Sequence, residues 1–228
     1  MTLRFVGRIF NAASVLAGLA ALTVCNAASA KTVTAQDPVV DDSLAATSGQ
    51  QTVVLSGGCF WGIQLVYEHV KGVVKVTAGY SGGSAKNPSY EMVSTGTTGH
   101  AESVKIVFDP SQISFGQLLK VFFSVAHDPT ELNRQGPDEG TQYRSAIFYA
   151  DENQRRIASA YIDQLDQSKI FPHKIVTQLT SLQGFYQAEG YHQDYAIHNP
   201  YNPYIMINDL PKVDHLRKQL PDLYVNYK

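Results

Sequence analysis

The sequence predicts an α+β fold: a mixed sheet of the split β-α-β (ferredoxin-like) kind, packed with helices, with long loops and an irregular C-terminal tail. Apolar segments of strand and helix length follow one another in the order β-α-β-β-α-β-α-β. Two strands in succession, without a helix between them, disfavour a doubly wound parallel sheet and favour a split β-α-β arrangement. The sequence has no internal repeat, and its length suits one domain with a full-sized core.

The pattern of apolar residues and of Gly, Pro and capping residues sets the expected elements. Strands are expected at residues 52–55, 73–78, 101–108, 144–150 and 174–179. Helices are expected at residues 59–70, 114–126 and 151–167, near 189–197, and, beginning with a proline, near 211–219. Ser114 and Asp151 are expected N-caps. The loops at residues 79–99 and 127–143 are long for a compact domain, which indicates a functional role.

The first thirty residues have the pattern of a secretory signal peptide. Arg4 and Arg8 precede an apolar run at residues 9–24, and residues 28–30 (ASA) supply the small side chains that a signal peptidase reads. The run is about 16 residues long, which is short for a membrane span of roughly 20. We therefore expect cleavage after Ala30 and export to a bacterial periplasm. An uncleaved anchor, or lipid attachment at Cys25, is the alternative.

Residues 31–51 are small and polar, without an apolar period, and predict a disordered leader before a folded domain at residues 52–228. Without Arg4 and Arg8, the chain after Ala30 has 16 basic and 20 acidic residues, a net charge of −4, and no basic cluster. This composition argues against nucleic acid as a partner, and against stable association with an anionic membrane after signal cleavage.

Cys59 is the only cysteine after Ala30, so no disulfide can form within the cleaved chain. In an exported protein a lone thiol is a liability unless it is buried in the core or used. Cys59 lies in residues 57–62 (GGCFWG), between an expected strand and an expected helix. The helix N-terminus favours the thiolate, the reactive form of cysteine. Phe60 and Trp61, the only tryptophan, add two aromatic faces beside the sulfur, which favours a site over ordinary packing.

The loop that leads to residue 102 offers two candidate partners for this thiol. His100 is a candidate base for Cys59, which would make the chain a cysteine hydrolase or acyl transferase, although such a histidine more often fixes a loop. Glu102 opens the next expected strand, where a carboxylate usually lies at a solvated rim. The glycines do not form a phosphate loop, because no Lys-Ser or Lys-Thr pair follows them. A redox sensor or peptide-binding module with an oxidisable Cys59 is the non-enzymatic alternative.

Five short blocks, in the same order, resemble the peptide-methionine (S)-S-oxide reductase family, MsrA. They are residues 58–62 (GCFWG), 79–83 (GYSGG), 87–90 (NPSY), 98–102 (TGHAE) and 140–145 (GTQYRS). Each block alone is a weak signal, but the five together are highly specific and extend over about residues 53–203. The family fold is an α+β domain, which agrees with the strand order above.

The resemblance implies a role for each residue of the candidate site. Cys59 matches the family nucleophile, and Phe60 and Trp61 match the apolar wall that receives the substrate methyl group. Glu102 matches the carboxylic acid that protonates the sulfoxide oxygen. A sulfoxide oxygen is a poor leaving group until it is protonated, and burial would keep such an acid protonated near neutral pH.

The remaining residues complete the implied site. Tyr90 and Tyr143 match hydroxyls that hold the oxygen, and Asp138 matches an acid of the same polar network. His100 has no catalytic role in the family and is assigned to structure. The implied reaction reduces methionine S-sulfoxide, in peptides, in proteins or as the free amino acid, and leaves Cys59 as a sulfenic acid. In an exported chain this reaction would repair oxidised exported proteins.

The resemblance implies no bound cofactor, but it requires an external reductant. Many family members recycle the nucleophile with one or two further cysteines in a C-terminal tail, and some have one in the loop. Here Ser94 stands at the loop position, and residues 203–209 (PYIMIND) contain no cysteine. We therefore expect a one-cysteine form whose sulfenic acid is reduced by an external thiol, either a thioredoxin-like protein or a small dithiol.

Residues 186–204 are dense in tyrosine and histidine. His192 and His198 are six residues apart, and no cysteine lies near them in the sequence. We expect ordinary packing and contacts at the substrate rim from this segment, and no metal site.

Overall fold

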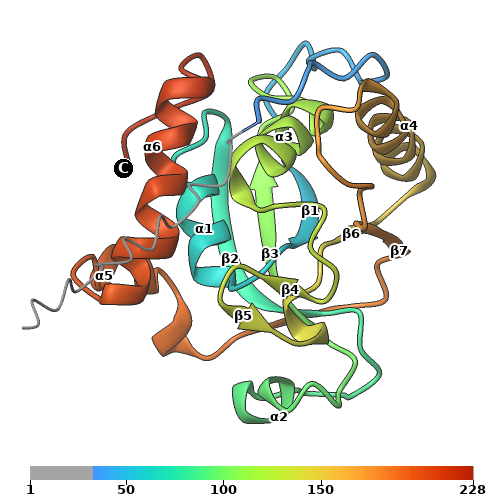
Figure 1. Ribbon diagram of the computed structural model, residues 1–228. Coiled ribbons are helices and arrows are strands. Elements are labelled where there is room, and N and C mark those ends of the chain that lie inside the picture. Colours follow the sequence, from blue (N-terminus) through green and yellow to red (C-terminus); the bar gives the residue numbers. More distant parts are fainter. Residues whose placement is uncertain (1–32, 228) are drawn as a thin grey trace, which may run out of the picture. The chain divides into compact units, whose positions relative to one another are not determined.

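Six strands form one sheet in the order β7-β6-β1-β3-β2-β8 (Figure 1). The strands are β1 (Gln51–Ser56), β2 (Val73–Ser81), β3 (Ala101–Phe108), β6 (Ala146–Tyr149), β7 (Gln178–Ser181) and β8 (Phe185–Gln187). A separate two-stranded ribbon consists of β4 (Arg134–Gln135) and β5 (Asp138–Glu139). This computed structural model describes residues 33–227, and the predicted signal peptide with Cys25 lies outside the described residues.

The central strands have the predicted split β-α-β arrangement. β3 lies between β1 and β2 and is antiparallel to both, so β1 and β2 run in the same direction and α1 (Phe60–Glu68) connects them. β6 pairs antiparallel with β1, and β6 and β7 pair in parallel, which makes the sheet mixed. The α+β prediction is therefore confirmed.

The helices expected at residues 59–70, 114–126, 151–167 and near 211–219 are found close to those bounds. The helix expected near 189–197 divides into a 3₁₀ turn and a short α-helix, and a further short helix at Tyr90–Ser94 lies in a segment expected to be a loop. The longer helices are α1, α4 (Glu152–Ser168) and α6 (Leu210–Gln219), and the shorter ones are α2 (Tyr90–Ser94), α3 (Phe115–Val121) and α5 (Tyr195–His198). Single turns of π-helix are η1 (Phe122–Ala126) and η4 (Ile205–Asp209), and single 3₁₀ turns are η2 (Thr141–Tyr143) and η3 (Gly190–His192). Ser114 and Asp151 cap α3 and α4 as predicted. Within residues 33–227, none of the helices is long and apolar enough to cross a membrane.

The position of β1 in the core explains why its buried residues form a continuous apolar run. Val53 and Leu55 point into the main core, which the strands share with α1, α3, α4 and α6. Val54 points to the opposite face and joins a smaller apolar cluster with Phe148 and the partly buried Phe185. A strand covered on both faces does not need to alternate with polar residues. α6 packs on α1, and α4 packs on α3 and β6 (Figure 1).

Among the strands, three short segments differ from the sequence-based expectation. β2 continues to Ser81 because it pairs there with the three-residue strand β8, which is too short to show a period in the sequence. The strand expected at residues 174–179 is found at Gln178–Ser181. The residues before it bond elsewhere: Ile175 donates to the carboxylate of Asp166 in α4, so tertiary contacts decide this boundary.

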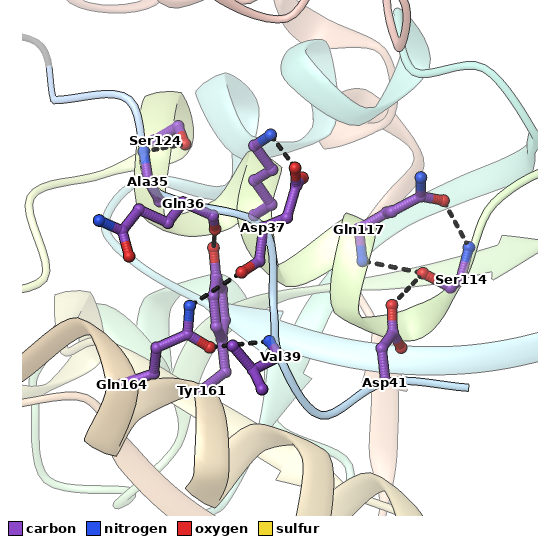
Figure 2. A network of polar contacts seen from close by, with 11 residues as sticks. Ala35, Gln36, Asp37, Val39, Asp41, Ser114, Gln117, Ser124, Tyr161 and Gln164 are labelled. Carbon is purple, nitrogen blue, oxygen red and sulfur yellow. Dashed lines mark hydrogen bonds and ion pairs between the residues drawn. The ribbon is translucent and has the colours of Figure 1, made fainter. Parts of the chain in front are cut away.

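The predicted disordered leader is wrong for residues 33–50, which pack against the domain without forming a helix or strand (Figure 2). Ala35 is only 1% exposed, and its backbone N–H donates to the hydroxyl of Ser124 over 3.0 Å. The Tyr161 hydroxyl of α4 donates to the Gln36 carbonyl oxygen. The composition predicts disorder because the segment offers little apolar surface, but hydrogen bonds to α4 and η1 anchor it.

Asp41 anchors the same segment at the start of α3. Its carboxylate accepts a hydrogen bond from the Ser114 hydroxyl (Figure 2). It accepts a second one from the Gly116 backbone N–H over 2.9 Å. A carboxylate is stabilised at a helix N-terminus, where backbone N–H groups lack partners within the helix. The leader thus completes the cap of α3.

Candidate active site

Cys59 is the N-cap residue of α1 and lies in the turn that connects β1 to that helix. The turn depends on glycine, because Gly58 has φ +100° and a Cβ atom there would come within 2.6 Å of the Gln135 side chain. The Cys59 side chain is 9% exposed and is the only free thiol among the described residues. The backbone therefore presents one nearly buried sulfur at a helix N-terminus.

Glu102 is a buried carboxyl group beside this thiol and not the solvated rim residue that its strand-end position suggests. It is 2% exposed, and its Oε2 atom accepts a hydrogen bond from the Phe60 backbone N–H over 3.1 Å. The pKa of Glu102 is raised to about 8, chiefly by burial and also by the charge of Asp138, whereas the hydrogen bonds of the Phe60 N–H and the Cys59 thiol act in the opposite direction. The carboxyl group is therefore mostly protonated at neutral pH.

The expectation of a thiolate at Cys59 is not met in the free protein. Burial raises the pKa of the Cys59 thiol well above its usual value, and the ionised forms of Glu102 and Asp209 raise it further. The Trp61 backbone N–H favours the thiolate but does not compensate. A helix N-terminus contributes typically about 0.3–1 kcal/mol, less than the cost of moving a charge out of water. Cys59 is thus a neutral thiol before substrate binds.

Tyr90 and Tyr143 lie in the same electrostatic environment. Burial raises the pKa of each phenol, and the charges of Glu102, Asp138 and Cys59 raise it in both cases. Tyr90 begins α2 and Tyr143 ends η2, so the two long loops each supply one hydroxyl. The structure therefore gathers the predicted polar residues around one acid.

An aromatic cluster borders the thiol through the residues that follow it. The Trp61 indole stacks on Tyr195 with ring centroids 4.0 Å apart and meets the edge of Tyr204 at 6.1 Å. Phe60 is buried, with its ring centroid 5.0 Å from that of His192. Phe60 and Trp61 thus lie in an aromatic cluster that a segment far along the sequence completes.

Sequence reasoning missed two acidic or phenolic groups of this site. The Tyr204 hydroxyl donates to Oδ2 of Asp138 over 2.5 Å, which joins the C-terminal segment to β5. Asp209 is fully buried, forms an ion pair with Lys212 at 3.1 Å, and contributes to the raised pKa of Cys59. No sequence signal pointed to Asp209; in the structure, Gly62 leaves room for it, because a Cβ atom at position 62 would overlap the Asp209 carboxylate.

His100 is occupied by its own loop. Its Nδ1 atom accepts from the Gly83 backbone N–H over 3.2 Å, and its Nε2 atom donates to the Ala85 carbonyl oxygen over 2.8 Å. Neither ring nitrogen is left to take a proton from Cys59. This arrangement removes the geometric basis for a Cys59–His100 hydrolase.

The two histidines of the C-terminal segment do not form part of a metal-binding cluster. No three His, Cys, Asp or Glu residues within residues 33–227 lie close enough together to hold a metal ion. His192 is buried against the aromatic cluster, whereas His198 is exposed, so the two histidines of the C-terminal segment have different surroundings.

Comparisons with known proteins agree with this site. A family model described as peptide methionine sulfoxide reductase matches residues 51–223. The peptide methionine sulfoxide reductase MsrA 2 of Mesorhizobium japonicum is 56% identical over 179 residues, which cover 78% of this chain and 92% of that protein. The protein of the same name from Synechocystis is 50% identical over 188 residues, covering 82% of this chain and 88% of that protein.

Two solved structures also resemble this chain in both fold and sequence. Methionine sulfoxide reductase A of Corynebacterium diphtheriae superimposes with a TM-score of 0.59 at 36% identity, covering 75% of this chain and 85% of that one. Reduced Mxr1 from Saccharomyces cerevisiae gives a TM-score of 0.62 at 31% identity, covering 70% of this chain and 94% of that one. The family match, the relatives and the buried Cys59–Glu102 pair agree: this chain belongs to the peptide methionine sulfoxide reductase family.

Proposed function

We propose that this reductase removes the oxygen of methionine S-sulfoxide in peptides and proteins, and in the free amino acid, with Cys59 as nucleophile and Glu102 as proton donor. The observation that carries the proposal is the buried, protonated Glu102 carboxyl group, bonded to the backbone of the residue that follows Cys59. A proton donor with a pKa near the working pH is suited to general acid catalysis.

The proposed step transfers one oxygen atom. Glu102 donates its proton to the sulfoxide oxygen, and the Tyr90 and Tyr143 hydroxyls donate hydrogen bonds to it. The Cys59 sulfur attacks the substrate sulfur of the activated sulfoxide and forms an S–S bond, and the Cys59 proton passes to the carboxylate that Glu102 has become. The hydroxyl group then moves from the substrate sulfur to the Cys59 sulfur as the substrate S–O bond and the S–S bond break. The substrate sulfur is thereby reduced by two electrons to the thioether, and the Cys59 sulfur is oxidised by two electrons to a sulfenic acid.

The raised pKa of the Cys59 thiol supports this order of events. A thiolate is the form that oxidants attack, so a thiol that stays neutral until substrate arrives is protected in an oxidising compartment. Protonation of the sulfoxide then makes the substrate sulfur electrophilic enough for attack at the moment the thiol ionises. The Cys59 thiol thereby reacts with the bound substrate but is protected from other oxidants.

The regeneration of Cys59 requires an external thiol in this proposal. Cys59 is the only cysteine of residues 33–227, and Ser94, at the loop position where some relatives carry cysteine, donates its hydroxyl to the Tyr90 carbonyl oxygen. A thiol of a small dithiol or a thioredoxin-like protein condenses with the sulfenic acid, releasing water and forming a mixed disulfide. The second thiol of the reductant then releases Cys59. No bound cofactor is needed for these steps.

We further propose that the protein works outside the cytoplasm, in a bacterial periplasm, where it repairs oxidised exported proteins. The support is the pattern of residues 1–30: two arginines, an apolar run and small residues at the expected cleavage site. N-terminal sequencing of the protein from a periplasmic extract tests this proposal. An N-terminus at Lys31 supports it, and a chain that keeps residues 1–30 in the cytoplasmic fraction contradicts it.

The reaction itself is tested with a peptide that carries racemic methionine sulfoxide, with excess small dithiol. The aromatic wall and the oxygen-binding hydroxyls lie on fixed elements, so one hand of the sulfoxide should fit. We expect half of the substrate to be consumed and the R epimer to remain, as resolved by chiral chromatography. Consumption of both epimers at similar rates would contradict the assigned pocket, and no consumption would contradict the reaction.

A further inference from the structure

His192 lies between the aromatic wall and the side of the site that binds oxygen. It is 2% exposed, and its ring centroid lies 5.0 Å from that of Phe60 and 4.5 Å from that of Tyr90. Its Nδ1 atom lies 3.1 Å from Nε1 of Trp61, in hydrogen-bond geometry. His192 therefore contacts both halves of the proposed pocket.

The hydrogen bond to Trp61 fixes the state of the imidazole. An indole N–H can only donate, so Nδ1 of His192 must accept, and the ring proton is on Nε2. Burial lowers the pKa of His192, while the carboxylates of Glu189 and Glu91 act weakly in the opposite direction. The neutral ring is therefore the form present at neutral pH, and the bond to Trp61 is the one hydrogen bond its side chain makes within residues 33–227.

The other contacts of Trp61 do not fix its orientation as firmly. Its stacking on Tyr195 is nearly parallel, at 15°, and allows the indole to slide or turn within its own plane. Its edge contact with Tyr204 involves the ring as a whole and no single atom, so this contact also leaves the indole free to turn. A hydrogen bond to Nε1 is directional and fixes the rotation of the indole within its own plane.

We propose that His192 is a positioning residue that holds the Trp61 indole so that the wall accepts a methyl group and rejects a larger alkyl group on the sulfoxide. The inference rests on the proposed function, because it takes Phe60 and Trp61 as the wall that receives the methyl group. His192 does not touch the reacting atoms in this account. It acts through Trp61 and sets specificity, not the chemistry at Cys59.

The test compares the S-sulfoxides of methionine and ethionine, which differ by one methylene group. Such a difference gives a ratio of kcat/KM on the order of 10 to 200 in a shaped pocket. His192→Leu keeps bulk but removes the acceptor, and we expect the methyl-to-ethyl ratio to fall by about 10-fold. In His192→Asn the side-chain oxygen stands near the position of Nδ1 and should retain most of the ratio. His198→Leu, in the exposed histidine of α5, is the matched control and should leave the ratio unchanged.

The single tryptophan allows a second test that leaves His192 in place and decides the question if His192→Leu does not fold. Uniform replacement of tryptophan by 3-benzothienylalanine changes only Trp61 and exchanges its N–H for sulfur at nearly the same shape. The ratio should fall as in His192→Leu, and both changes together should lower it no further. An unchanged ratio in the analogue protein, or additive losses in the combination, would overturn the inference. Failure of the proposed function looks different, because the unmodified protein would then reduce neither sulfoxide.

Discussion

The backbone N–H of Phe60 donates to Oε2 of Glu102 over 3.1 Å, so the residue that follows Cys59 holds the buried carboxyl group. The bond joins the first turn of α1 to the start of β3, two elements that the split β-α-β topology brings together. Burial raises the pKa of Glu102 to about 8, and the N–H of Phe60 moderates that shift. One backbone group thus positions the acid and tunes its affinity for a proton.

Glu102→Gln should slow the reaction on the order of 100-fold, because the amide cannot donate the proton that the leaving oxygen needs. In the unmodified enzyme, kcat/KM should fall as the pH rises through about 8, where Glu102 loses its proton. That fall should be absent in the variant. Initial rates on both sides of this pH measure both effects, and a near-normal rate for Glu102→Gln at neutral pH would show that another group is the acid.

The same substitution should change how stability depends on pH. A Glu has a pKa of about 4.3 when unfolded and Glu102 has a pKa of about 8 when folded, so between these values the folded state holds a proton that the unfolded state has released. The free energy of unfolding should therefore fall as the pH rises through this window, by at most about 1.4 kcal/mol per pH unit for this group.

Denaturant unfolding of the enzyme and of Glu102→Gln measures that slope. Glu68, whose pKa burial raises to about 9, acts with the same sign in both proteins, so the difference between them isolates Glu102. Parallel pH profiles of stability for the two proteins would contradict the raised pKa.

The sequence predicts the central fold because its main elements carry strong local signals. The strand at Ala101–Phe108 and the N-caps Ser114 and Asp151 are found as expected, since each is defined by its own residues. β8 and the packed leader were not predicted, because their positions depend on partners far away in the chain. Ala35, for example, is fixed by Ser124, which no local pattern connects to it.

The candidate site also contains residues that short sequence motifs identify and residues whose positions depend on distant contacts. Cys59 and Glu102 stand in short motifs that the family resemblance identifies, and the structure places them together. Tyr204 and His192 come from a segment without a regular period, whose place is set by contacts with Trp61. The protonation state of Cys59 was also beyond the sequence, because burial by the rest of the fold outweighs the local effect of the helix N-terminus.

Tyr204→Phe should lower kcat/KM by about 10-fold or more, because it leaves Asp138 without the hydroxyl that pairs with it and a lost partner costs about 1–3 kcal/mol. The phenyl ring keeps the edge contact with Trp61, so the fold should be retained, and the melting temperature should fall by about 2–4 °C for each kcal/mol that the lost hydrogen bond contributed. Tyr201→Phe, at a residue that is 87% exposed, is the matched control and should behave as the unmodified enzyme does. Equal activity of the two variants would exclude Tyr204 from the polar network.

Asp41→Ala should destabilise the domain by about 1 kcal/mol, because it removes the carboxylate that accepts from Ser114 and Gly116. For a domain of this size that change lowers the melting temperature by about 2–4 °C. Asp42→Ala, which removes an exposed ion pair with Arg156, should have a smaller effect. Calorimetry of the two variants compares them directly, and equal, negligible shifts would mean that the leader contributes nothing to folding.

The most direct test of the account is a single turnover without any reductant. The enzyme is mixed with excess methionine S-sulfoxide peptide, and the peptide products and the intact protein are examined by mass spectrometry, with Cys59→Ser as the inactive control. We predict one equivalent of reduced peptide per enzyme and one added oxygen atom at Cys59 that a sulfenic-acid probe captures, with turnover restored by a dithiol. Reduced peptide from Cys59→Ser, or a Cys59–Cys59 disulfide between two chains as the main product, would contradict the one-cysteine cycle.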